Sequence, residues 1–576
     1  MAGSRHGFVR GANLPRESRL FEGRFGRMFR SLPALDLDPA DPAVRDLAFS
    51  MAQPEGTVDP DNPTGGTKAG EGIMAAVEPL GPTAETDPLG DGEEGLIPAG
   101  YTYLGQFIDH DLTFDPASSM ERQNDPDALV DFRTPRFDLD SVYGRGPDDQ
   151  PYMYDMPTAT PVRKFLLGDQ IGIPATGHND PDARDHLRGP ANSAGIRRAL
   201  SGDKRNDENV IVAQMHTIFL RFHNRLADKK PELDFEGIQQ LVRWHYQWVV
   251  LHDYLPRIVG PDMVDSILPH LASHKSIFDD PPKLHHYDWK NDPYLPTEFS
   301  AAAFRFGHSM VRPVYRLSRK FQDLKPTPTT IEDKNANRSS RRMVFDGAFD
   351  PAFPDRGLNG FQKIPTGWAI EWDLFFGKLD PDPHEKTPER VQPAYKVDTS
   401  LVNPLASLPE FLGVGREANL AYRNLLRGFS MRLPCGEDVA RAMGLDLLEP
   451  DWLRIGKAED LAGFKVGTPF ADFPFAGKKP FKDATPLWLY ILAEGAKNAL
   501  TGVPYALGPV GGRIVAETMI GLMLGDSHSF LSQDPAWKPM NWEKDRANNP
   551  FDMLDFINFA QGKPPAARPV GPTAAA

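Results

Sequence analysis

Apolar residues recur every three to four positions in several long stretches of this chain, which is the spacing of one helical face. The clearest stretches run over 210–226, 238–251, 487–500 and 514–524. Strand-like alternation of apolar and polar residues is scarce, and 56 prolines break the sequence between the periodic stretches. The sequence therefore predicts a mainly α fold: a single large domain with long ordered loops and little β structure.

Both ends of the chain lack this apolar period. Residues 53–100 are rich in Gly, Pro, Asp and Glu, a composition typical of a loop or arm. The last fifteen residues, GKPPAARPVGPTAAA, are also irregular. We expect an N-terminal arm with a Gly/Pro-rich acidic segment over 1–100, the main body over 101–561 and a flexible tail over 562–576.

Charge and cysteine content exclude several classes of protein. The chain holds 64 Lys and Arg against 79 Asp and Glu, and its net charge of −15 does not suit nucleic acid or an anionic membrane surface. Cys435 is the one cysteine, so no intramolecular disulfide can form, and its acidic neighbours favour a structural role. No apolar run has the length of a signal peptide or of a membrane span. We expect a soluble protein, either cytoplasmic or exported by a leaderless route, and the oligomeric state stays open.

Three polar residues share one face of a helix expected around GQFIDHDL, residues 105–112. Gln106, Asp109 and His110 stand at i, i+3 and i+4, so their side chains point the same way. Asp111 is rotated by about 100° from His110 and faces elsewhere. One helix can thus offer an amide, a carboxylate and an imidazole to a single pocket. The alternative is a histidine that only packs in the core.

A second constellation is GDKRNDE, residues 202–208, in which Arg205 and Glu208 stand at i, i+3. The alternative interpretation is the first turn of the following helix, capped by Asn206 or Asp207, with the glutamate favoured by the helix dipole.

A third constellation, FRFGHSMV at 304–311, places His308 beside a glycine on an expected apolar helix. A flat group could approach the backbone there, which suits a proximal ligand, although a buried core histidine is the commoner case.

The fourth constellation is an acidic loop, TPRFDLDSVYG, at 134–144. Asp138 and Asp140 alternate in it, with a threonine hydroxyl and backbone carbonyls nearby. Such a set of hard oxygen atoms suits calcium, which accepts six to eight oxygen ligands in flexible geometry. A solvated acidic turn is the alternative.

These four stretches, in this order, resemble the animal-type haem peroxidases of the peroxidase–cyclooxygenase superfamily. The matched blocks lie between residues 105 and 427, and the most specific are QFIDHD, GDKRNDEN followed by HTIFLRFHNRLA, and AFRFGHSMVRP. The DLDSVYG form of the acidic loop looks closest to the bacterial branch. The resemblance implies that residues 101–561 form a haem peroxidase catalytic domain.

The resemblance also implies roles for individual residues. The catalytic set would be His110 as distal acid and base, Gln106 beside it and Arg205 as the distal arginine. The haem-binding set would be His308 as proximal iron ligand, Asn424 accepting the other ring N–H of His308, Arg427 as a propionate partner, and Asp109 and Glu208 as carboxylates that form esters with haem methyl groups. The calcium shell would be Asp111, Thr134, Arg136 through its carbonyl, Asp138 and Asp140. Asp140 stands where mammalian members carry Ser, so this shell would be more negative.

The implied function is reduction of hydrogen peroxide and oxidation of halides, thiocyanate or small aromatic donors through an oxo-iron intermediate. The implied cofactors are haem b, ester-linked to the chain, and calcium. A fatty-acid dioxygenase of the same superfamily is the first alternative, but it needs a radical-forming tyrosine three residues before the proximal histidine, where this chain has Arg305. A non-enzymatic haem or calcium binding protein is the second. The sequence does not identify the reducing substrate.

Overall fold

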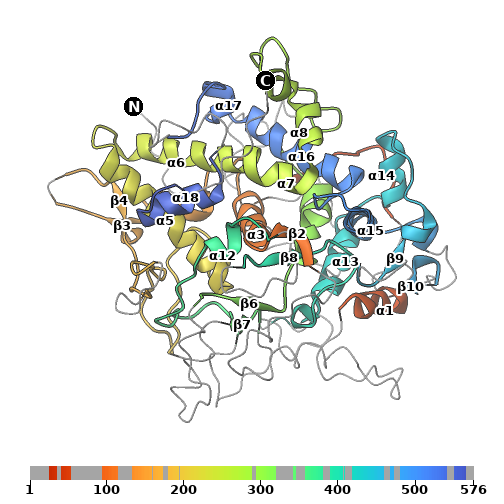
Figure 1. Ribbon diagram of the computed structural model, residues 1–576, viewed down its shortest axis with the longest axis horizontal. Coiled ribbons are helices and arrows are strands. Elements are labelled where there is room, and N and C mark those ends of the chain that lie inside the picture. The colour runs from red at the N-terminus through yellow and green to blue at the C-terminus, as the bar shows by residue number, and fades with distance from the viewer. Residues whose placement is uncertain are drawn as a thin grey trace.

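The computed structural model describes residues 25–35, 41–52, 94–114, 131, 133–158, 160–172, 180–193, 195–288, 293–319, 341–345, 357–380, 390–406, 408, 418–458, 468–472, 481–540 and 551–565. Helices dominate these residues, as the apolar spacing predicts (Figure 1). The α-helices are α1 Pro42–Met51, α3 Gly100–Leu112, α4 Asp140–Tyr143, α5 Val210–Lys229, α6 Phe235–Val249, α7 Leu255–Val259, α8 Pro261–Ile267, α9 Pro269–Ser273, α10 Thr297–Ala301, α12 Asp373–Phe376, α13 Leu420–Ser430, α14 Gly436–Ala442, α15 Leu487–Leu500, α16 Pro509–Gly525, α17 Phe530–Gln533 and α18 Met553–Gln561.

The strands are short and lie in two-stranded pairs. The pair β1 (Phe25–Gly26) with β5 (Leu295–Pro296) is parallel. The antiparallel pairs are β2 (Glu94–Pro98) with β8 (Pro393–Tyr395), β3 (Tyr154–Asp155) with β4 (Lys164–Phe165), β6 (Val314–Arg316) with β7 (Arg341–Met343), and β9 (Arg454–Ile455) with β10 (Thr468–Pro469). No larger sheet forms among the described residues, so the mainly α prediction with little β structure is confirmed.

The periodic stretches become the long helices of the core. Residues 487–500 form α15, 210–226 lie within α5, and 514–524 lie within α16. The stretch 238–251 begins in α6 and runs into η6 (Val250–Tyr254), a π-helical turn. Asn209 begins α5, because its side chain accepts a hydrogen bond from the backbone N–H of Ile211 at 2.9 Å.

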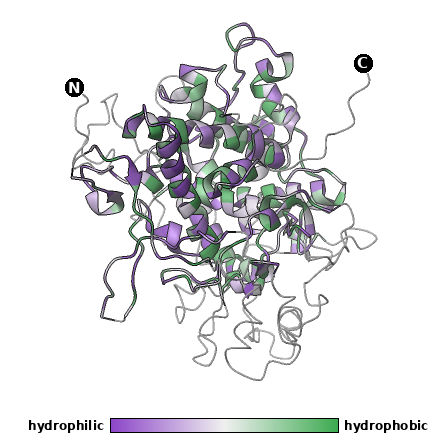
Figure 2. Ribbon diagram, turned by 60° about the vertical axis from the view of Figure 1, so that its left-hand side comes forward, coloured by the Kyte–Doolittle hydropathy of each residue, from purple (hydrophilic) through white to green (hydrophobic). Residues whose placement is uncertain are grey.

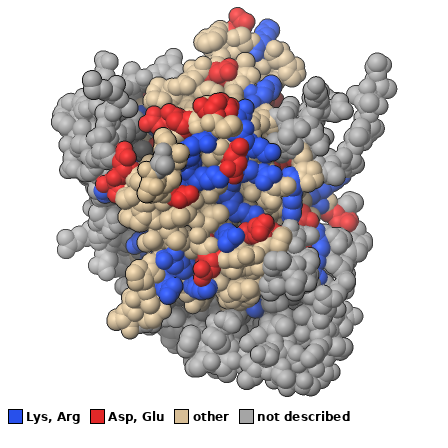
Figure 3. All heavy atoms as spheres, turned by 90° about the vertical axis from the view of Figure 1, so that its left-hand side faces the viewer, with Lys and Arg blue, Asp and Glu red and all other residues tan. Residues whose placement is uncertain are grey.

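Helix α3 runs through the middle of the molecule, with α5 on one side and α6 and α7 above it in Figure 1. The stacked rings of Phe107 and Phe219, 4.4 Å apart, join α3 to α5, and those of Phe222 and Phe556, 3.8 Å apart, join α5 to α18. The ribbons of the surrounding helices carry both polar and apolar residues, as amphipathic helices do (Figure 2). Acidic and basic side chains are interspersed on the face shown in Figure 3.

The described parts of the first hundred residues pack onto the body. The Glu298 carboxylate accepts the backbone N–H groups of Met28 and Phe29 at 3.0 Å, and the Asn419 amide donates to the Ala52 carbonyl at 2.8 Å. The loop predicted up to residue 100 ends earlier, because 94–98 pair with β8 as strand β2. Residues 53–93 and 566–576 lie outside the described residues. None of the described helices is long and apolar enough to cross a bilayer.

Candidate haem and cation site

The predicted polar face of α3 points toward the segment that follows Asp203. His110 is almost fully buried; its Nδ1 lies 2.9 Å from Oδ1 of Asn206, and its Nε2 lies 3.3 Å from Oε1 of Glu208. The amide of Gln106 donates a hydrogen bond to the same Glu208 oxygen. Asp109 lies one residue before His110 and keeps its side chain 33% exposed. The His110 imidazole and the Gln106 amide therefore both meet the Glu208 carboxylate, while Asp109 approaches Arg205.

Arg205 comes from η5 (Lys204–Asp207), a 3₁₀ turn, and holds the end of α3. Its Nη2 donates to the carbonyl of Thr113 and, at 3.2 Å, to that of His110. The same nitrogen lies 2.9 Å from Asp203, while Nη1 lies 3.9 Å from Asp109. Arg205 thus lies against the carboxyl end of the helix that carries His110, where cations are favoured by the helix dipole.

The alternative interpretation of this segment as a helix cap is wrong. Neither Asn206 nor Asp207 caps α5, because both lie within the 3₁₀ turn and Glu208 separates them from Asn209, which caps the helix instead. Asp207 pairs with Arg188, with an Nη2–Oδ1 distance of 2.8 Å. Asn206 turns inward to His110.

His308 ends η7 (Ala303–His308), a 3₁₀ helix rather than the expected α-helix, and α3 packs against it. Asn424 of α13 contacts His308, with 2.8 Å between Nδ2 and the ring Nδ1. Its Oδ1 accepts from Nη1 of Arg305 at 3.0 Å, and a guanidinium can only donate. The amide N–H therefore faces His308, the reverse of the orientation in which Asn424 would accept the ring N–H.

The residues around His308 fit a flat anionic cofactor. A Cβ built on Gly307 would meet no atom of the described residues within 4 Å, so the backbone there borders open space. Burial and the nearby charge of Arg427 lower the pKa of Arg305 to about 10, with Asp109 acting in the opposite direction. Burial and Arg305 lower the pKa of His308 to about 3, so its ring is neutral and can offer a lone pair to a metal. Anionic propionates would relieve the repulsion between the two arginines.

The acidic loop and α3 bring three buried carboxylates together. One oxygen from each of Asp111, Asp138 and Asp140 lies within 4.8 Å of the others. Burial raises the pKa of Asp111, and the charges of Asp140 and Asp138 add to the shift. The Thr134 hydroxyl donates to Asp138 at 2.9 Å. This clustering of hard oxygen atoms fits a calcium ion, which would remove the repulsion.

Arg136, the remaining predicted member of the shell, lies in the same loop. Its backbone N–H donates to the Thr134 carbonyl at 2.8 Å, and its side-chain Nε lies 3.7 Å from Asp526. The role predicted for its carbonyl stays a prediction.

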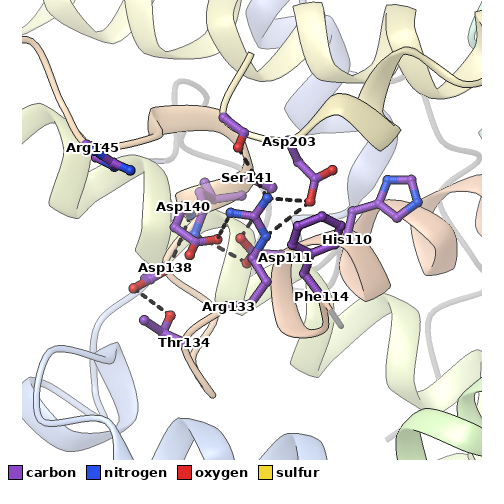
Figure 4. A network of polar contacts seen from close by, with 12 residues as sticks. His110, Asp111, Phe114, Arg133, Thr134, Asp138, Asp140, Ser141, Arg145 and Asp203 are labelled. Atoms are coloured by element: carbon purple, nitrogen blue, oxygen red, sulfur yellow. Dashed lines mark hydrogen bonds and ion pairs between the residues drawn. The ribbon is translucent and has the colours of Figure 1, made fainter. Parts of the chain in front are cut away.

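Arg133 links the carboxylate cluster to Asp203, the partner of Arg205, and the sequence motifs do not include it. Its Nη1 lies 3.3 Å from Asp140 and its Nε 3.1 Å from Asp203, so the guanidinium lies between them, while the His110 ring points away from the cluster (Figure 4). Burial alone would raise the pKa of Asp203, but Arg205 and Arg133 hold it well below its usual range. The one sequence feature that could have indicated Arg133 is its position directly before the acidic loop 134–144. Its partner Asp203 is distant in the sequence and could not be predicted from it.

Cys435 is buried, and burial raises the pKa of its thiol to about 12. The thiolate form is therefore suppressed, which agrees with the structural role expected from its acidic neighbours.

Parts of the chain are similar to known haem peroxidases. The family model for animal haem peroxidase matches residues 123–358, which include Arg205, Glu208, His308 and the acidic loop but not α3. Human myeloperoxidase is 28% identical over 268 residues, 42% of this chain and 31% of that protein. Human lactoperoxidase is 33% identical over 168 residues, 28% of this chain and 21% of that protein. The matched segments thus span less than a third of these relatives.

Among solved structures, peroxidase A from Dictyostelium discoideum aligns with a TM-score of 0.53 at 13% identity, covering 96% of both chains. This likeness shows that the two proteins share a fold along nearly their whole length. The family model and the curated relatives, which match parts of the chain, agree with this shared fold in relating the chain to the peroxidase–cyclooxygenase superfamily.

Proposed function

We propose that this protein is a haem peroxidase that reduces hydrogen peroxide and oxidises halides, thiocyanate or small aromatic donors. The observation that carries the proposal is the packing of α3, with buried His110, against η7, with neutral His308. Two histidines on contacting elements can serve the two faces of one haem, the first as acid and base and the second as iron ligand. Haem, when bound, would supply the redox chemistry with peroxide.

The residues on the distal side suit proton transfer to and from peroxide. His110 Nε2 faces the region shared with Gln106 and Glu208, and it can take a proton from one peroxide oxygen and deliver it to the other. Arg205, fixed against the end of α3, would stabilise negative charge as the O–O bond breaks.

On the proximal side, His308 would hold the iron and Arg305 and Arg427 would bind the propionates. If Arg305 turned to a propionate, the Asn424 amide could rotate and accept the N–H of His308, the predicted role, which would raise the basicity of the ligand. Arg305 also stands where a dioxygenase of this superfamily would need its radical-forming tyrosine, which favours the peroxidase.

Two finer features belong to the proposal. The cluster of Asp111, Asp138 and Asp140 would bind calcium and hold the end of α3 to the acidic loop. Asp109 and Glu208, with side chains 33% and 21% exposed, would form esters with haem methyl groups after exposure to peroxide. The acidic loop also suggests membership of the bacterial branch.

The decisive experiment is an absorbance spectrum of the purified protein, as isolated and after addition of haem, followed by mixing with H₂O₂. We expect a Soret band that shifts on addition of peroxide, and turnover of bromide, thiocyanate or a phenol. Free haem at the same concentration is the control. A protein that binds no haem, or that consumes peroxide no faster than free haem, would overturn the proposal.

A further inference from the structure

Asn206 lies between two buried histidines behind the distal site. Its Oδ1 is 2.9 Å from Nδ1 of His110, and its Nδ2 is 3.0 Å from Nδ1 of His216. Both rings and the amide are fully or almost fully buried. The sequence predicts for Asn206 only a role as a helix cap, and the contact with His110 comes from the tertiary structure.

A backbone carbonyl fixes which way the amide points. Nδ2 of Asn206 also lies 3.3 Å from the carbonyl oxygen of Ser141, which can only accept a hydrogen bond. The NH₂ group must therefore face Ser141, and Oδ1 must face His110. Because an amide oxygen can only accept, the hydrogen between Asn206 and His110 belongs to Nδ1 of the imidazole.

The backbone of Asn206 is anchored as firmly as its side chain. Its N–H donates to the Asp203 carbonyl at 3.2 Å, and its own carbonyl lies 3.1 Å from Nε2 of His186. Every donor and acceptor of this asparagine thus has a partner, at a residue with no exposed surface. A buried amide in such a network has one orientation, since any rotation leaves polar groups unpaired.

We propose that Asn206 is a positioning residue that fixes the tautomer of the distal histidine. The inference rests on the proposed function of His110 as acid and base. With a hydrogen held on Nδ1, the other ring nitrogen, Nε2, is the one that gains and loses a proton, and it faces Glu208 and the distal region. Loss of the Asn206 oxygen allows the ring to rotate or to adopt the tautomer with its hydrogen on Nε2, which cannot accept a proton from peroxide.

Three substitutions separate this role from a contribution to folding. Asn206→Ala removes the acceptor, and Asn206→Asp keeps an oxygen at the same place. Asn209→Ala is the matched control: it removes an asparagine from the same segment, whose side chain caps α5 and does not contact His110. The probe is cyanide, added as HCN to the haem-loaded protein, because its proton must pass to a base while the anion binds the iron, without any O–O chemistry.

We expect Asn206→Ala to slow cyanide association, and the Soret change with H₂O₂, by about 10- to 100-fold at unchanged haem content. Asn209→Ala should stay close to the wild type, and Asn206→Asp, which keeps an acceptor for His110 but loses the donor to Ser141, should be faster than Asn206→Ala. The inference is wrong if Asn206→Ala associates with cyanide as fast as the wild type, or if Asn206→Asp or Asn209→Ala is as slow as Asn206→Ala.

Failure of the proposed function would look different. A wild type that binds haem and cyanide but does not react with peroxide is no peroxidase, while the cyanide rates still test Asn206. If the wild type takes up no haem, ¹⁵N chemical shifts of histidine-labelled protein give the tautomer directly, with the His110 signals assigned by their loss in His110→Gln. A hydrogen on Nε2 rather than Nδ1 of His110 would refute the inference.

Discussion

The Nη1 atom of Arg133 lies 3.3 Å from Oδ1 of Asp140, one of the three buried carboxylates that meet beside α3. The carboxylates and the guanidinium together carry two net negative charges, which one divalent cation would neutralise. Arg133 therefore offsets the charge of one of the three buried carboxylates, that of Asp140. The same guanidinium contacts Asp203, the partner of Arg205, so the carboxylate cluster and Arg205 share one charge network.

Bound calcium is the first prediction from this network. Elemental analysis should find one calcium per chain, and prolonged chelation should lower the melting temperature, because Asp111, Asp138 and Asp140 then repel one another in a buried setting. Asp138→Asn should lose the ion and reduce the effect of the chelator. A protein without calcium, whose melting temperature is unchanged by chelation, would contradict the assignment.

Removal of Arg133 should make the fold depend more strongly on calcium. Arg133→Gln leaves Asp140 without its buried cation and Asp203 with Arg205 alone, and breaking a buried pair costs about 3–5 kcal/mol. We expect the melting temperature to fall further in chelator than in calcium, where the ion still compensates Asp140. Arg145→Gln is the control: Arg145 pairs at 3.2 Å with Asp149 and is 44% exposed, so its loss should cost at most about 1 kcal/mol. Equal losses in the two media would refute the coupling.

The two histidines should respond differently to removal. His308→Ala should lose haem or bind it weakly, whereas His110→Ala should keep its haem and react with peroxide about 10²–10⁴-fold more slowly. Haem content by absorbance and the rate of the Soret change in a stopped-flow instrument measure the two effects. A normal peroxide rate in His110→Ala would remove His110 from the distal role.

The sequence predicts the helices well where apolar residues recur every three to four positions without interruption. The stretch 487–500 coincides with α15, and 210–226 lies inside α5, because apolar spacing reports directly on local structure. The side chains Gln106, Asp109 and His110 do share a face of α3. Local spacing is sufficient for these predictions because all three residues belong to one helix.

The missed residues depend on tertiary contacts that spacing does not encode. Arg133 matters because Asp203, distant in the sequence, meets its guanidinium. Asn206 is of a residue type that often caps helices, so its sequence position predicts a cap. In the structure it lies in a 3₁₀ turn, and its side chain contacts His110. The orientation of the Asn424 amide follows from its hydrogen bond with Arg305, and no sequence motif predicts that contact.

Glu494 should make the stability of the protein fall between acidic and neutral pH. Burial raises the pKa of this carboxyl to about 7, above a usual value of 4.5, although the backbone N–H groups of Gly511 and Val510 oppose the shift. The folded state then holds a proton that the unfolded state has lost, so stability decreases as pH rises from about 4.5 to 7, by up to about 3 kcal/mol. Glu494→Gln keeps the shape and one acceptor and cannot titrate. Its free energy of unfolding, relative to wild type, should rise over this pH range, and a constant difference would contradict the prediction.

Covalent attachment of haem is the last prediction. Oδ1 of Asp109 accepts from the Thr113 hydroxyl at 3.0 Å, while Glu208 accepts from Gln106, so both carboxylates are held in place and remain partly exposed. Each ester would replace one hydrogen of a haem methyl group by a carboxylate oxygen. That is a two-electron oxidation, for which one H₂O₂ is the oxidant and two molecules of water are the products. Peroxide should therefore create the links, and a protein that has not met peroxide should lack them.

The measurement is mass spectrometry of peptides after treatment with a small excess of H₂O₂, with acid–organic extraction in parallel. We expect haem on peptides that contain Asp109 and Glu208 and a fall in extractable haem. Asp109→Asn and Glu208→Gln should each retain the other link, and the double variant should release all its haem unmodified. The variants separate an ester from tight non-covalent binding, because each replaces a carboxylate with an amide of the same shape that can still form hydrogen bonds. If the treated wild type also releases all its haem unmodified, the two carboxylates only form hydrogen bonds beside the haem, and the proposed peroxidase activity is unaffected.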